Sequence, residues 1–139
     1  MPIEITSFLH AGIRVGPSED EQAAARAFYA GLLGLETDDK RPDIKGIPGF
    51  WSNVHAGDRG QQIHIMGAEG MSPSARSTQE DPTRHHLAFA VADLDEAKKE
   101  LEASGFKYWI YESLVGDGSY QLFCEDPFGN MIELQQASA

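Results

Sequence analysis

Apolar and polar residues alternate with a period of two in four segments of the chain. From Leu9 to Val15 in FLHAGIRV (8–15), apolar residues alternate with His10, Gly12 and Arg14. A period of two is the pattern of a β-strand whose two faces differ in polarity. The other segments with this pattern are QIHIM (62–66), HHLAFAV (85–91) and NMIELQ (130–135).

Two helices are predicted by their start and stop signals. Ser18 begins an S-x-x-E capping box and Gly34 occupies a C-cap position, so a helix is predicted from about residue 19 to 33. The same two signals flank LDEAKKELEAS, residues 94–104. Further strands are predicted near residues 35–38, 50–54, 107–112 and 119–125.

The order of these elements is β-α-β-β-β, and it occurs twice. Module one covers about residues 5–67 and module two about residues 84–137, and the polar stretch 68–83 with its two prolines is predicted to be a linker. A chain of 139 residues has room for one compact domain, so residues 1–139 are expected to form a single unit of this kind. The predicted fold class is α+β, with two βαβββ modules pairing into an open, incomplete eight-stranded barrel.

One metal-capable residue lies on the face away from the helix in each of the four alternating strands. The alignment of HAGIRV with HLAFAV makes His86 the equivalent of His10. Because successive residues of a strand point to opposite faces, His85 is predicted to lie on the helix face. On that helix face, Leu87, Phe89 and Val91 are expected to pack against the helix. Two sheets placed edge to edge would direct the four metal-capable residues into one cavity, and these residues are His10, His64, His86 and Glu133.

Three imidazoles and one carboxylate form a donor set suited to Fe(II), Zn(II), Ni(II), Co(II) or Mn(II) and unlike an oxygen-only calcium site. An octahedral ion with four protein ligands would have two positions for adjacent oxygens of a substrate. A single histidine on a strand is more often a hydrogen-bonded core or surface residue than a ligand. Four such residues at equivalent positions of two repeats favour a metal or active-site cluster.

Charge and cysteine content restrict the partners and the compartment. The chain has 11 basic and 22 acidic residues and a formal net charge of −11, which argues against binding to nucleic acid or to an anionic membrane surface. It has one cysteine, lacks a secretory signal pattern at its start and has no apolar run long enough to span a bilayer. We therefore expect a soluble cytoplasmic protein with a small-molecule substrate.

Six motifs of the chain form a recognisable set: LHAGIRV, ARAFYAGLLGLE, GFWSNV, QQIHIM, HHLAFAVADLDEA and EDPFGNMIEL. As a set they resemble those of the vicinal oxygen chelate superfamily, the group of glyoxalases, bleomycin resistance proteins and extradiol dioxygenases. The resemblance covers nearly the whole chain apart from the linker and implies a metal held by His10, His64, His86 and Glu133.

Two positions bear on the substrate. Arg14 occupies the place of a glutathione-contacting arginine in glyoxalase I, but that enzyme has an acid where this chain has His64 and an asparagine where this chain has Ala68. Arg14 would then bind another anionic substrate or pair with an acid of this chain. Trp51 is either a core residue or an aromatic that stacks on a planar substrate.

The resemblance leaves three functions open. The first is a metal-dependent lyase or isomerase in which Glu133 or His64 moves a proton between carbons, with Glu133 the better base. The second is an Fe(II) dioxygenase that uses His10, His86 and Glu133, with His64 as an acid or base outside the ligand set. The third is a metal-free, antibiotic-binding resistance protein. For each of them a homodimer is expected, because modules of this superfamily commonly pair between chains.

Overall fold

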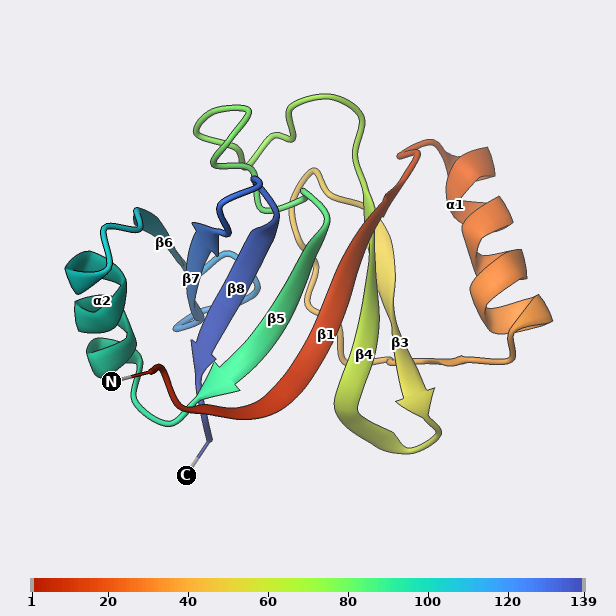
Figure 1. Cartoon of the computed structure of the whole chain (residues 1–139). Helices are drawn as coiled ribbons and strands as arrows, with labels where there is room; N and C mark the ends of the chain where they lie inside the picture. The colour runs from red at the N-terminus through yellow and green to blue at the C-terminus, as the bar shows by residue number, and fades with distance from the viewer. Residues whose placement is uncertain (1, 139) are drawn as a thin grey trace. The chain divides into compact units, whose positions relative to one another are not determined.

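The protein is described by a computed structural model that covers residues 2–138. Eight strands and two α-helices follow one another in the order β-α-β-β-β twice, as the sequence predicts (Figure 1). The first repeat consists of β1 (Ile5–Val15), α1 (Glu19–Arg26), η1 (Ala27–Leu32), β2 (Glu36–Thr37), β3 (Gly49–His55) and β4 (Asp58–Gly67). The second consists of β5 (His86–Val91), α2 (Leu94–Ala103), β6 (Tyr108–Glu112), β7 (Tyr120–Glu125) and β8 (Met131–Gln136).

All eight strands belong to one mixed sheet with the order β2-β3-β4-β1-β5-β8-β7-β6. The order ends at two separate edge strands, β2 and β6, so the sheet does not close into a barrel. The predicted α+β class and the open arrangement of eight strands are confirmed. Among the described residues, no helix is long and apolar enough to cross a membrane.

The chain divides into two compact units. The first unit is His10–His85, and the second combines the chain up to Leu9 with the chain from His86 onward. Strand β1 therefore contributes its first half to the second unit and its second half to the first unit. Within the first unit α1 runs beside β3 and β4, and within the second unit α2 lies beside β6 and β7 (Figure 1).

Strand register confirms the internal repeat residue by residue. In the first repeat β1 pairs in parallel with β4, and Gly12 lies opposite His64. In the second repeat β5 pairs in parallel with β8, and Ala88 lies opposite Glu133. Gly12 comes two residues after His10, and Ala88 comes two residues after His86. His64 and Glu133 therefore occupy equivalent positions of the two repeats.

The first helix begins as the sequence predicts and ends differently. Ser18 accepts a hydrogen bond from the backbone of Glu21, and Glu21 completes the capping box. The expected helix to residue 33 is α-helical only to Arg26 and continues as the π-helix η1, in which the Leu33 N–H donates to the Phe28 carbonyl. Six residues are too few for hydrophobic periodicity to separate a π-helix from an α-helix.

Each helix covers an apolar cluster on one face of its own unit. In the second unit Val91 and Leu134 are buried with α2, and Phe89 packs partly against them. Leu87 was expected to join this cluster, but it is 45% exposed. The reason is the position of α2, which contacts β8 and leaves the start of β5 uncovered.

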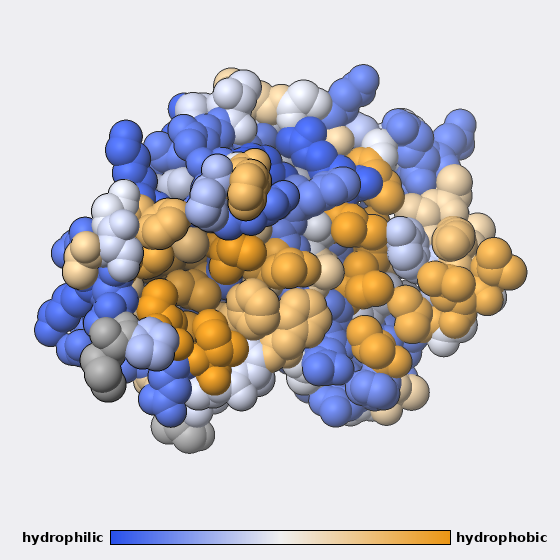
Figure 2. All heavy atoms as spheres, viewed as in Figure 1, coloured by the Kyte–Doolittle hydropathy of each residue, from blue (hydrophilic) through white to orange (hydrophobic). Residues whose placement is uncertain are grey.

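Some large apolar side chains remain on the surface of the first unit. Leu32 is 77% exposed, and Phe28 and Leu33 on the same segment are also exposed. Figure 2 shows hydrophobic side chains gathered where Figure 1 draws α1 and its continuation. Contiguous exposed apolar surface of this kind commonly marks an interaction site.

Candidate metal centre

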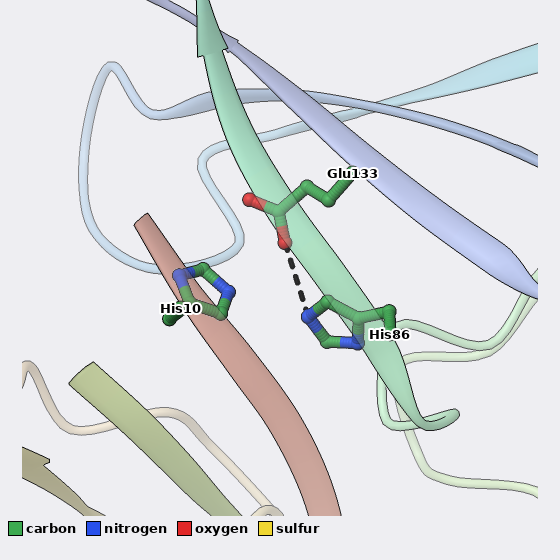
Figure 3. Close-up of side chains that lie close together, drawn as sticks. All are labelled: His10, His86 and Glu133. Atoms are coloured by element: carbon green, nitrogen blue, oxygen red, sulfur yellow. Dashed lines mark ion pairs between the residues drawn. The ribbon is translucent and has the colours of Figure 1, made fainter. Parts of the chain in front are cut away.

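In the second unit, strands β5 and β8 bring His86 and Glu133 together. Both side chains point to the face away from α2, where Ala88 and Ala90 are also buried. His86 is 7% exposed and Glu133 is 1% exposed. His86 Nε2 lies 3.2 Å from Glu133 Oε1 (Figure 3). A buried imidazole and a buried carboxylate thus present donor atoms to one place.

The second carboxylate oxygen of Glu133 is held by two amides. Gln121 Nε2 donates to Glu133 Oε2 at 3.3 Å, and Gln135 Nε2 donates to the same oxygen in a shorter hydrogen bond. Register explains both contacts, because Phe123 lies opposite Glu133 and Gln121 is two residues before it on β7. Gln135 is two residues after Glu133 on β8 and shares its face.

An aromatic group lies beside this pair. The His86 ring meets the Phe123 ring edge to face, with centroids 5.8 Å apart. Trp109 and Tyr111 contact the same Phe123 ring. Among the described residues, Trp109 Nε1 is buried without a hydrogen-bond partner. An aromatic cluster thus lies beside the polar groups of the His86–Glu133 pair.

In the first unit, His10, His64 and Trp51 form a stack. The His10 and His64 rings are 3.7 Å apart with an angle of 18° between their planes. The Trp51 and His64 rings are 4.2 Å apart with an angle of 6°. His64 therefore lies between an imidazole and an indole, and Trp51 is on the predicted site face.

His64 Nε2 is hydrogen-bonded to a network formed by Gln62, Asp38 and Asn53. Gln62 Nε2 donates to Asp38 and Asn53, so Gln62 Oε1 is the acceptor in its 2.9 Å contact with His64 Nε2. This assigns the proton of that contact to His64 Nε2. Burial acts to raise the pKa of Asp38, but hydrogen bonds from Lys40 N–H and other donors outweigh it and hold that pKa below its usual value.

Arg14 holds the 68–83 segment. Its guanidinium donates to Asp81 Oδ2 at 3.1 Å, to Thr83 Oγ1 at 2.7 Å and to the Thr83 carbonyl at 3.0 Å. Asp81 in turn accepts hydrogen bonds from Ser72 N–H and Oγ. The predicted linker contains no helix or strand, yet its end is tied to β1. A substrate contact of Arg14 stays a prediction.

Sequence reasoning assigned the faces of the site residues but missed their partners. The structure brings His86 to Glu133 and stacks His64 between His10 and Trp51. His85 is exposed, whereas His86 is buried. Alternation along NMIELQ puts Gln135 on the same face as Glu133. The same alternation on β7, combined with the pairing of Phe123 and Glu133, would have identified Gln121 as a neighbour of Glu133.

A family model for the Glyoxalase/Bleomycin resistance protein/Dioxygenase superfamily matches residues 8–134 of the chain. No curated protein matches the sequence.

Several solved structures share the fold. Methylmalonyl-CoA epimerase from Mycobacterium tuberculosis is 23% identical with a TM-score of 0.68, covering 100% of this chain and 93% of its own. A variant of the Streptomyces coelicolor methylmalonyl-CoA epimerase, in complex with 2-nitronate-propionyl-CoA, is 19% identical with a TM-score of 0.66, covering 98% of this chain and 100% of its own. A hypothetical protein from Bacillus halodurans is 21% identical with a TM-score of 0.65, covering 96% of this chain and 98% of its own. At these identities the comparisons show the fold alone.

Proposed function

Because the chain belongs to the Glyoxalase/Bleomycin resistance protein/Dioxygenase superfamily, we propose that it is an enzyme dependent on a divalent transition metal. The proposed reaction is that of a lyase or isomerase of the glyoxalase type. The proposed substrate is a small molecule that offers two vicinal oxygens. The candidate metals are iron, zinc, nickel, cobalt and manganese.

One grouping of residues carries the proposal. His86 and Glu133 are buried in the second unit with His86 Nε2 3.2 Å from Glu133 Oε1 (Figure 3), and His10, the equivalent of His86 in the first repeat, is also buried. Two imidazoles and a carboxylate are a donor set that first-row transition metals accept. A buried carboxylate and two buried imidazoles are costly to desolvate, and a bound cation would offset that cost. The donor set therefore fits a divalent metal.

The residues of the chain take separate roles in this proposal. His10, His86 and Glu133 would hold the ion, which supplies Lewis-acid polarisation of substrate oxygens when bound. Glu133 Oε1 would hold the ion and would accept the proton only when it is not bound to the ion, since Glu133 Oε2 is occupied by the two amides. Trp51 offers an aromatic plane, and its near-parallel stacking on His64 keeps that plane fixed.

His64 remains a candidate fourth ligand and proton carrier. Its Nε2 atom already donates to Gln62, so metal binding through that atom would break the Gln62 contact. We therefore expect His64 to contribute less to metal affinity than the other three residues. Cys124 is not a candidate nucleophile, because burial raises the pKa of its thiol to about 11.

The contact between His64 and Gln62 also favours a second candidate function. If His64 stays with Gln62, the remaining ligands are two histidines and one carboxylate. This is the triad that Fe(II) oxygenases use. An Fe(II) extradiol-type dioxygenase is therefore the alternative, with His64 acting as an acid or base beside the ligands.

Elemental analysis of the protein purified without added metal, followed by oxygen uptake with catechols, tests these functions. Stoichiometric zinc, nickel, cobalt or manganese without oxygen uptake supports the lyase or isomerase. Stoichiometric iron with uptake supports the dioxygenase. Protein that stays metal-free after incubation with each ion would contradict both and favour an antibiotic-binding protein.

Variants connect the metal to the proposed ligands. His10→Ala and Glu133→Ala are each expected to lose stoichiometric metal. His55→Ala is the matched control, because His55 ends β3 and is exposed. A cytoplasmic location also stays a prediction and rests on the lone cysteine.

A further inference from the structure

We propose that Gln121 and Gln135 are positioning residues that lock the Glu133 carboxylate, so that Oε1 alone can bind a metal ion. The inference rests on the proposed function and extends it to residues outside the ligand set. All the contacts that carry it lie within the second unit.

The two amides approach Glu133 from different strands. Gln121 is 6% exposed and comes from β7, and Gln135 is half-buried and comes from β8. Both donate through Nε2, and both donate to Oε2 of Glu133. A rotation of the carboxylate would therefore break two hydrogen bonds at once.

Oε1 is turned the other way, toward Nε2 of His86 at 3.2 Å. A carboxylate oxygen has about two lone-pair directions. Because two N–H groups already use those of Oε2, this oxygen has none to offer to a cation. We infer that Glu133 binds a metal through one oxygen, whereas an unrestrained carboxylate can use both.

The orientation of the Gln121 amide supports the same conclusion. Its carbonyl oxygen Oε1 is buried without a hydrogen-bond partner among the described residues. Turning the amide over would place that oxygen against the Glu133 carboxylate, where two acceptors repel. A buried acceptor without a partner is unusual in a native protein. Here it is explained if the N–H end is needed at Glu133.

The test compares Gln121→Met, Gln135→Met and the double variant with the wild-type protein. Methionine keeps the length of glutamine and removes the donor. Gln61→Met is the control, because Gln61 is an exposed residue of β4. Gln121→Asn and Gln135→Asn are the substitutes if thermal unfolding shows that a methionine variant does not fold. Asparagine keeps the amide but is one methylene shorter, so the amide is withdrawn from Glu133.

The first measurement is Zn(II) affinity by competition with a chelator. Loss of residues that orient a ligand typically weakens metal binding by about 10- to 100-fold, and we expect that loss in each single variant but not in Gln61→Met. The second measurement is the infrared carboxylate stretch of the Zn(II)-loaded protein, assigned to Glu133 by comparison with Glu133→Ala. In the wild type, the frequency separation between its symmetric and asymmetric bands should be that of a monodentate carboxylate. In the variants, this separation should narrow to that of a bidentate carboxylate.

Variants that bind Zn(II) as the wild type does, with unchanged carboxylate bands, would overturn the role of the two glutamines and leave the proposed function standing. A wild-type protein that binds no Zn(II) and no other candidate metal would overturn the proposed function and this inference with it. Weaker binding without a change in the bands would also overturn the inference, since a purely structural role predicts that result.

Discussion

At the scale of single residues, the neighbours His85 and His86 differ in burial and are predicted to differ in metal binding. His86 is buried beside Glu133, whereas His85 is exposed and precedes the first residue of β5. Because successive strand residues face opposite sides, one ion cannot recruit both. We predict that His86→Ala loses metal and activity, while His85→Ala keeps both. Metal content and activity of the two purified variants check this, and the reverse pattern would contradict the site.

At the scale of elements, the 68–83 segment depends on one buried carboxylate. Asp81 is 1% exposed and is bound by Arg14, Ser72 and Thr83. We predict that Asp81→Asn lowers the free energy of unfolding at pH 7 by about 3 kcal/mol, because the mutation leaves Arg14 without its anion. Urea unfolding measures the loss, and Asp117→Asn at an exposed loop position is the control.

The same carboxylate predicts a dependence of stability on pH. Burial acts to raise the pKa of Asp81, but its hydrogen bonds with Ser72 and Thr83 outweigh burial and hold the pKa below the ordinary value of 3.8. The folded state then binds fewer protons than the unfolded state. The stabilisation is complete well above pH 3.8 and is lost as the pH falls through the lower folded pKa. Wild-type urea midpoints should therefore fall more steeply in acid than those of Asp81→Asn, and equal slopes would contradict this account.

At the scale of the whole molecule, we predict a homodimer. The segment with Phe28, Leu32 and Leu33 exposes apolar surface next to α1, and a second copy of the chain would cover it. Sedimentation velocity at micromolar concentration is expected to give a dimer for the wild type. Leu32→Glu should shift it toward monomer, because Leu32 is 77% exposed and a charge there would oppose burial. A monomeric wild type would contradict the prediction.

The sequence by itself determined the order of elements, the repeat and the face on which each candidate residue lies. The alternation of side chains along a strand and the capping signals of a helix are local properties of the sequence. The segments FLHAGIRV and HHLAFAV are therefore enough to predict that His10 and His86 face away from the helices. The capping box at Ser18 was likewise readable and is present. Local rules failed at the π-helix and at Leu87, where the outcome depends on how a helix ends or where it packs.

Only the tertiary structure decided which groups meet. Gln121 and Glu133 are 12 residues apart in sequence, and Arg14 and Asp81 are 67 apart. Their contacts follow from strand register and from the path of the 68–83 segment, which no periodicity encodes. The contacts of Gln121 with Glu133 and of Arg14 with Asp81 therefore had to come from the fold. A hydrogen bond is a short, directional contact between partners that the sheet brings together, and alternation along one strand cannot specify the partner on another.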